Sequence, residues 1–291
     1  MPLDQKKLRK PLVQLRKLLR KTSRVPTQDE VHHIRTNTRR TEATVEALQL
    51  DRRRKGRRTL RAITPIRKRA GEVRDMDVLM GFSATISSDS DGSCLVRLLE
   101  HLGKERARGA RKLRKTILKR RKVAIARLRA CASLIEKNFE MNNARVRTEW
   151  PVDAAAVALR ISRELMNWPK LSADSLHAFR LKVKELRYVV QLSGQDNELI
   201  VRLGAVKDLI GEWHDWAELD AMAKELLSEC HHCGVVSQIA KTARNKFETA
   251  LKASELLRKN YFEGQVGRKR RIRRGLSMKS SILKATASLA A

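Results

Sequence analysis

The chain has 291 residues, of which 42% are hydrophobic, so it can bury a core and is not globally disordered. Only 13 Gly and 6 Pro interrupt it, and Leu, Ala, Arg, Lys and Glu dominate, which predicts an all-α protein. The net charge is +32, and a body with such a charge favours a polyanionic partner: a nucleic acid, a membrane surface or another polyanion.

The positive charge is spread unevenly along the chain. Residues 1–145 hold 39 basic and 15 acidic side chains, residues 146–263 hold 17 of each, and residues 264–291 hold eight basic and no acidic ones. We therefore expect the N-terminal half to provide most of the attraction for a polyanion.

The N-terminal segment 3–21 predicts an amphipathic helix with four leucines on one face: Leu8, Leu12, Leu15 and Leu19. This segment is charged throughout and lacks the apolar region of a signal peptide. No segment of the chain reaches the ~18 uninterrupted apolar residues of a transmembrane helix. With four cysteines and no secretion signal, the chain is expected to carry reduced thiols in the cytoplasm.

Thr27-Gln28-Asp29-Glu30 forms a capping box, which begins a helix of about 22 residues that ends near Leu50. A very basic helix is expected from residue 52 to residue 70, and Gly71 separates it from a short helix through GEVRDMDVLMGF. Residues 87–93 are a predicted loop. Residues 94–139 predict one long helix, or two with a break near Gly103–Gly109.

Residues 142–151 have the character of a linker. Beyond it, helices are expected over residues 152–168, 173–193, 198–209, 212–229 and 235–261. From residue 264 the chain has little packing signal and is predicted to be disordered. These limits divide the chain into two halves, 1–145 and 146–263, and a basic tail, 264–291.

Two sequence patterns occur twice in the same order. VHHIRTNTR at 31–39 matches LHAFRLKVK at 176–184, offset by 145 residues, and GEVRD at 71–75 matches GEWHD at 211–215, offset by 140. This self-similarity predicts two similar helical halves, related by a pseudo-two-fold axis.

Each histidine helix has a cationic stripe opposite an apolar face when its residues are placed at ~100° intervals. In the second half the stripe holds His177, Arg180, Lys184, Arg187 and Tyr188, and the apolar face holds Phe179, Val183, Leu186 and Val190. In the first half the stripe holds His32, Arg35 and Arg39. The apolar face opposite holds Ile34, Val45 and Leu48. Arginine forks and lysine ammonium groups at this spacing suit a linear chain of phosphates.

A solvated basic face with a satisfied histidine is the alternative interpretation of either stripe, but the duplication of the pattern favours a function. In the GE-x-x-D pieces, Arg74 and His214 could point at an anion. Gly71 and Gly211 could instead permit close packing, with the aspartates holding cations in place. We favour this role for the aspartates, because a carboxylate near a polyanion is repulsive.

Other motifs carry less chemistry. A further basic stripe lies at residues 108–122 and comprises Arg108, Arg111, Lys115, Lys119 and Lys122. Cys230-His231-His232-Cys233 lacks the second ligand pair of a structural zinc site, so we expect no metal. The chain has no phosphate-binding glycine loop and no spacing typical of a catalytic triad, so no cofactor and no catalysis are expected.

The duplicated pieces resemble the CHAD domain family, the conserved histidine α-helical domain. The resemblance covers roughly residues 3–262 and is carried by VHHIRTNTRR at 31–40, GEVRDMDVL at 71–79, LHAFRLKVKELRY at 176–188 and LGAVKDLIGEWHD at 203–215. It implies two pseudo-symmetric four-helix bundles with a basic central groove that binds inorganic polyphosphate, and targeting to polyphosphate granules.

Carried over by position, the resemblance assigns the groove to His32, Arg35, Arg39 and Arg40 from one half and His177, Arg180, Lys184 and Arg187 from the other. We add Arg74, Arg111, Lys115 and Lys207 as candidate binding residues. Thr41-Glu42 departs from the family pattern, in which an apolar residue and an arginine are common. No strand-rich triphosphate-processing segment of the CYTH type is present.

The leading hypothesis is non-catalytic binding of inorganic polyphosphate. The alternative is nonspecific nucleic-acid binding, to which the basic tail GRKRRIRRG at 267–275 would contribute, although aromatics for base stacking are few. A third hypothesis is a scaffold or granule-coat protein in which the helix at 3–21 contacts a partner or a hydrophobic inclusion. The oligomeric state and the length of the bound polymer are not indicated by the sequence.

Overall fold

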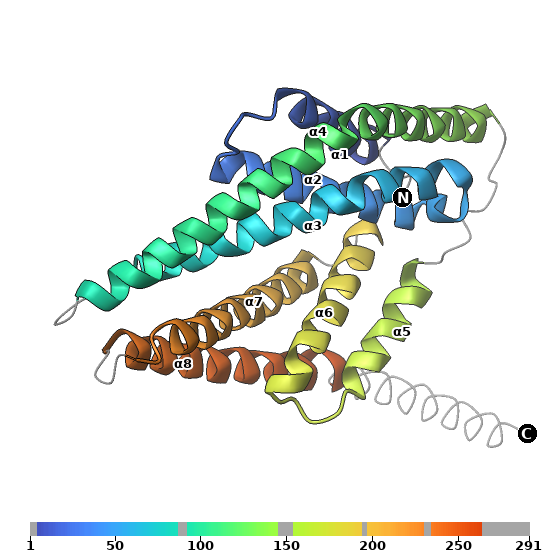
Figure 1. The fold of residues 1–291 in the computed structure, drawn as a ribbon. Helices are drawn as coiled ribbons and strands as arrows, with labels where there is room; N and C mark the ends of the chain where they lie inside the picture. The colour runs from blue at the N-terminus through green and yellow to red at the C-terminus, as the bar shows by residue number, and fades with distance from the viewer. Residues whose placement is uncertain (1–4, 87–91, 145–153, 194–196, 230–233, 264–291) are drawn as a thin grey trace, which may run out of the picture. The chain divides into compact units, whose positions relative to one another are not determined.

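A computed structural model describes residues 5–86, 92–144, 154–193, 197–229 and 234–263. These residues form α-helices and two short helical segments, with no strand among them (Figure 1). The expected all-α fold class is confirmed. Within the described part of the chain, no helix is both long and apolar enough to cross a membrane.

The helices follow one another along the chain with these bounds: α1 Gln5–Lys21, α2 Gln28–Ala47, η1 Leu50–Arg52, α3 Arg54–Ser83, α4 Gly92–Ala144, α5 Ala154–Met166, α6 Ala173–Ser193, α7 Asn197–Leu226, α8 Gly234–Leu257 and η2 Arg258–Glu263.

The capping box at the start of α2 is confirmed. The backbone N–H of Glu30 donates to Oγ1 of Thr27 at 3.2 Å, and the backbone N–H of Thr27 donates to Oε2 of Glu30 at 3.0 Å. These two bonds satisfy donors that the first turn of a helix leaves without a partner. The helix ends at Ala47, and Gln49 turns the chain into η1 with a left-handed φ of 49°.

Two predicted helix breaks are wrong. Helix α3 runs unbroken through Gly71, and α7 runs unbroken through Gly211, where a boundary near residue 210 was expected. A glycine inside a helix costs only about 1 kcal/mol relative to alanine, which packing on neighbouring helices offsets. Helix α4 is the single long helix of the two alternatives and extends to Ala144. The remainder of the linker, the loop at 87–91 and the tail at 264–291 lie outside the described residues.

The described residues form two compact units. The first contains α1 to α4 together with Asp215–Ala240, which is the end of α7 and the start of α8. The second contains α5, α6, α7 as far as His214, and α8 from Lys241 onward. The predicted halves at 1–145 and 146–263, their pseudo-symmetry and the central groove stay predictions.

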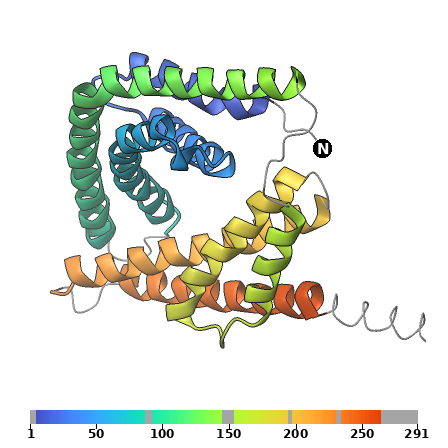
Figure 2. The ribbon, with the colours of Figure 1, turned by 90° about the vertical axis from the view of Figure 1, so that its right-hand side faces the viewer.

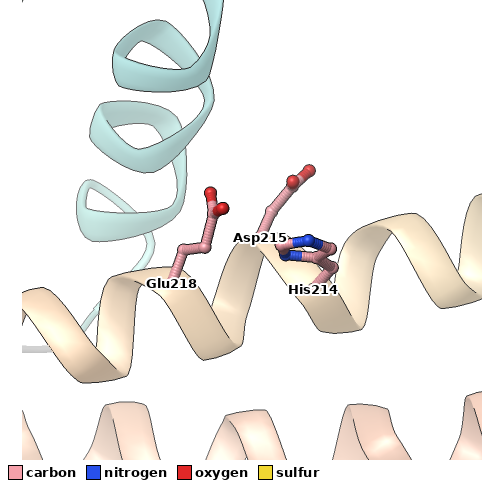
Figure 3. A group of neighbouring side chains, drawn as sticks. All are labelled: His214, Asp215 and Glu218. Carbon is pink, nitrogen blue, oxygen red and sulfur yellow. The ribbon is translucent and has the colours of Figure 1, made fainter. Parts of the chain in front are cut away.

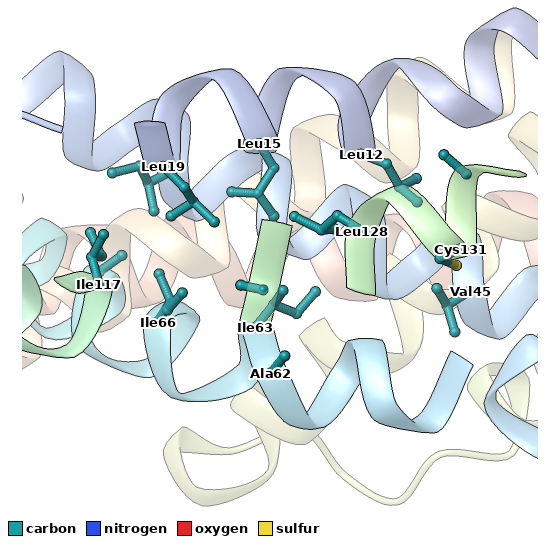
Figure 4. Packing of buried hydrophobic residues seen from close by; sticks show 14 of the residues in the cluster. Leu12, Leu15, Leu19, Val45, Ala62, Ile63, Ile66, Ile117, Leu128 and Cys131 are labelled. Atoms are coloured by element: carbon teal, nitrogen blue, oxygen red, sulfur yellow. The ribbon is translucent and has the colours of Figure 1, made fainter. Parts of the chain in front are cut away.

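The leucine face of α1 lies in the core of the first unit. Leu12, Leu15 and Leu19 are fully buried, and Leu8 is 9% exposed. They pack with α2, α3 and α4 side chains such as Ile63 and Leu128 (Figure 4). The hypothesis that this face contacts a partner or an inclusion is therefore wrong, because the face is already covered by the protein's own core.

Helices α3 and α4 pack along each other in the first unit (Figures 1 and 2). The Arg106 guanidinium donates to the fully buried carboxylate of Asp77 at 2.6 Å and to the Pro26 carbonyl at 3.2 Å. Near this pair α4 comes close to α3, since a methyl group added at Gly109 would lie 3.1 Å from Val73. Gly109 thus allows the close approach and does not break the helix.

The apolar face predicted for α6 is confirmed in the second unit. Phe179, Val183 and Leu186 are fully buried and Val190 is 6% exposed, and they pack with α5, α7 and α8. The Phe179 ring lies edge-on to the indole of Trp168 at 5.7 Å between centroids. In the first unit, Ile34, Val45 and Leu48 are likewise buried. Each histidine helix therefore directs its cationic stripe away from its core.

Two glycines of α3 should respond oppositely to the same substitution. A methyl group at Gly56 would lie 1.9 Å from the Leu50 carbonyl oxygen, whereas one at Gly71 would meet nothing within 4 Å. Gly56→Ala should destabilise the fold by roughly 1–3 kcal/mol, as overpacking does. Gly71→Ala should stabilise it by roughly 0.5–1 kcal/mol. Denaturant unfolding followed by circular dichroism measures both, and equal effects of the two variants would contradict the close contact at Gly56.

Candidate functional site

In the first unit, the histidine helix α2 packs on the GEVRD segment of α3. The Arg35 guanidinium lies 3.7 Å from the carboxylate of Asp75. His32 is exposed at the surface one turn away, with the ring of His33 at 5.7 Å. The predicted role of Asp75, to hold a cationic side chain in place, fits this contact.

Two cations and two carboxylates lie near Arg35. Burial lowers the pKa of Arg35 from its ordinary value, Arg39 and Arg74 lower it further, and Asp75 and Asp215 raise it. Burial, Arg74 and His33 likewise lower the pKa of His32. Burial is the largest cause of both shifts and neighbouring cations add to it, so an anion bound there would favour the charged forms of Arg35 and His32.

The cationic stripe of α2 ends in an ion pair. Glu42 lies one turn beyond Arg39, and its carboxylate accepts from Nε of Arg67 at 2.9 Å and from the hydroxyl of Thr64 at 3.3 Å. The departure from the family pattern at Thr41-Glu42 thus has a structural reason. Thr41 is buried and donates to the Asn37 carbonyl at 2.7 Å, while Glu42 joins α2 to α3.

In the second unit, Arg180 of α6 packs against Gly211 of α7. Nε of Arg180 donates to the carbonyl of Lys207 at 3.2 Å. A methyl group at Gly211 would lie 2.7 Å from one terminal nitrogen of Arg180. The close-packing role expected of Gly211 therefore holds, whereas Gly71 in the first unit faces open space.

Arg187 repeats this arrangement two turns further along α6. A methyl group at Gly204 would lie 3.4 Å from Nε of Arg187, and that buried Nε has no hydrogen-bond partner. With the offsets of the repeat, Arg187 corresponds to Glu42, and Gly204 and Lys207 correspond to Thr64 and Arg67. The positions of the Glu42–Arg67 ion pair of the first unit are therefore occupied by two cations, Arg187 and Lys207, in the second unit.

The other second-unit candidates surround these arginines. The ammonium of Lys184 lies 5.7 Å from the centroid of the Tyr188 ring. The ring of His177 stands edge-on to that of His214 at 4.9 Å. Lys207 forms an ion pair with Asp208. The α6–α7 pair therefore carries His177, Arg180, Lys184, Arg187 and Lys207, and their binding of phosphate stays a prediction.

Arg39 and Arg74 are half-buried near Arg35, whereas Arg40 is exposed on α2. Arg111 and Lys115 are exposed on α4, and in the described part of the chain no hydrogen bond or ion pair joins them to the α2–α3 residues. Their part in binding stays a prediction.

Three side chains of α7 could hold a metal ion, which the sequence analysis did not foresee. Ligand atoms of His214, Asp215 and Glu218 lie within 4.8 Å of one another (Figure 3). Their signal in the sequence was the i, i+4 spacing of His214 and Glu218, which places both on one face of a helix. Cys94 and Cys131 are buried thiols, and the motif at 230–233 lies outside the described residues.

The family model of the CHAD domain matches residues 8–224. The crystal structure of the CHAD domain from the plant Ricinus communis is similar to this chain, with a TM-score of 0.57 and 14% sequence identity, over 89% of this chain and 88% of that one. At this identity the likeness concerns the fold alone. No curated protein sequence matches the chain significantly.

Arg74→Gln should raise the pKa of His32. Burial is the largest cause that lowers this pKa, and the positive charge of Arg74 is the second largest. In the wild type this pKa lies below the ordinary value of about 6.5. Protonation of His32 therefore destabilises the fold as the pH falls from about 6.5 through the folded pKa.

NMR titration of the imidazole signals measures the pKa directly. Lys10→Gln, which removes one charge from an exposed position of α1, should leave the pKa of His32 unchanged. An unchanged pKa in Arg74→Gln would contradict the placement of Arg74 beside His32.

Proposed function

The chain belongs to the CHAD domain family, and from this premise we propose that it binds inorganic polyphosphate without catalysing a reaction. The observation that carries the proposal is the α6–α7 pair, where Arg180 and Arg187 lie on Gly211 and Gly204. Glycines at these positions hold two guanidinium groups close to the helix backbone. The side chains thereby lose less freedom when an anion binds.

The spacing of the two arginines suits a linear polyanion. They are seven residues apart, which corresponds to about 10 Å along the helix, so they can contact separate phosphates of one chain. The arginine fork binds phosphate oxygens in pairs, and Lys184 and Lys207 add point charges beside it. The Nε of Arg187 is buried against Gly204, so the terminal nitrogens of this guanidinium are the donors that would meet a phosphate.

The two tryptophans of α7 give no support to nucleic-acid binding, although Tyr188 beside Lys184 is 38% exposed. Trp216 is buried and stacks on Phe82 at 4.8 Å, and Trp213 packs against Phe247 at 5.3 Å. Since both indoles are engaged in packing, they do not offer a platform for base stacking. Competition of labelled polyphosphate with RNA and duplex DNA tests nucleic-acid binding through the basic tail. Association with polyphosphate granules in the cytoplasm is part of the proposal.

Lys184→Ala combined with Arg187→Ala should weaken polyphosphate binding by ten-fold or more. Charge-assisted hydrogen bonds contribute roughly 1.5–3 kcal/mol each, and about 1.4 kcal/mol is a factor of ten. Arg35→Ala combined with Arg39→Ala should act in the same direction. Fluorescence anisotropy with labelled polyphosphate at physiological salt measures the affinity. The fold of the Lys184–Arg187 variant should persist, because the apolar face of α6 lies opposite the two changed residues.

The matched control is Arg244→Ala combined with Lys252→Ala, which removes the same charge from exposed positions of α8. It should bind almost as the wild type does. If both double variants lower the affinity equally, with unchanged circular dichroism, the protein is a general cationic surface and the proposal is wrong.

We also predict that the protein does not hydrolyse polyphosphate or nucleoside triphosphates. Phosphoryl transfer generally needs a positioned nucleophile as well as bound metal ions, and the cations gathered on α6 supply no nucleophile. A phosphate-release assay with and without added Mg²⁺ checks this. Release that follows the protein through purification and disappears in the Lys184–Arg187 variant would contradict it.

A further inference from the structure

We propose that His214, Asp215 and Glu218 of α7 bind one divalent transition-metal cation, and that this cation presents positive charge to the phosphate chain. The second part rests on the proposed function. All three residues come from one continuous helix, so their spacing is set by the helix itself.

The geometry of the three side chains suits such a site. Their ligand atoms lie within 4.8 Å of one another, and the carboxylates of Asp215 and Glu218 project from the same side of α7 (Figure 3). Two atoms that bind one Zn²⁺ at about 2.1 Å are at most about 4.2 Å apart. Glu218 is exposed, so a small rotation of its side chain closes the difference.

The comparison of the two repeats gives the reason for a cation at this place. With the offset of 140 residues, His214 corresponds to Arg74, Asp215 to Asp75 and Glu218 to Val78. The first unit carries a fixed positive charge at Arg74. The second repeat has an imidazole at His214 and an additional carboxylate at Glu218 in the corresponding positions. A carboxylate added to a phosphate-binding surface is repulsive unless a cation accompanies it.

The donor set selects the kind of metal. Imidazole nitrogen suits Zn²⁺, Ni²⁺ and similar ions, and carboxylate oxygens complete a mixed nitrogen and oxygen set. Three protein ligands leave a coordination position for water or for a phosphate oxygen. The ring of His177, edge-on to His214 at 4.9 Å, limits the rotation of the imidazole and so helps to orient it.

The binding of Zn²⁺ itself is tested on the full chain without polyphosphate, by titration against a chelating dye. Glu218→Gln should bind one equivalent of Zn²⁺ fewer per chain than the wild type. Glu225→Gln, which removes another exposed carboxylate of α7, should bind as the wild type does. Equal binding by Glu218→Gln and the wild type overturns the site. With Co²⁺, the equivalent that Glu218→Gln loses should show no thiolate charge-transfer band; such a band would assign it to cysteines and overturn the site as well.

The link to phosphate is tested with a variant that copies the first unit, His214→Arg combined with Glu218→Val. Added Zn²⁺ should tighten polyphosphate binding by the wild type several-fold more than by this variant. Because polyphosphate itself binds Zn²⁺, both proteins are compared at the same total concentrations. An equal response of the two proteins overturns the link. Polyphosphate binding by the wild type in chelator tests the proposed function separately, so the two failures are distinguishable.

Discussion

Repulsion between closely spaced cations is the constraint that shapes both helix pairs. Like charges near a protein surface repel each other, and Arg35 has Arg39 and Arg74 beside it as well as the carboxylates of Asp75 and Asp215. The free protein tolerates this crowding because the cationic stripes face away from two well-packed cores. Asp75 partly neutralises Arg35, and the fully buried apolar faces of α2 and α6 supply the stability that the charges reduce. Under the proposed function, a bound polyanion would replace this repulsion by attraction.

The two units accommodate their cations with corresponding helix pairs, α2–α3 and α6–α7, but with different side chains. In the first, carboxylates at positions 42 and 75 pair with arginines of the same helix pair. In the second, Gly204 and Gly211 let Arg187 and Arg180 lie flat on α7, where the first unit has Thr64 and Gly71 at the corresponding positions. Although residues 146–263 carry no net charge, their α6–α7 pair therefore holds a locally dense group of cations.

Periodicity in the sequence was sufficient to predict the helices and their faces. The burial of Ile34, Val45, Phe179 and Leu186 follows from the 3.6-residue repeat, and the CHAD assignment follows from the duplicated histidine and GE-x-x-D pieces. The ends of helices were harder, because Gly71 and Gly211 signal a break only when packing does not offset their cost. Contacts between distant residues, such as Glu42 with Arg67 and Arg187 with Gly204, depend on how two helices pack, which a single helical wheel does not contain.

The central claim is that the folded helices, and not the basic tail, bind polyphosphate. The most direct measurement is competition of labelled polyphosphate against RNA and duplex DNA, at physiological salt, on a chain that lacks residues 264–291. Binding by the helices predicts that the shortened chain keeps its affinity for polyphosphate, steeply dependent on salt, and that nucleic acids compete poorly. Loss of polyphosphate binding with unchanged helical content, or equal competition by RNA, would contradict it.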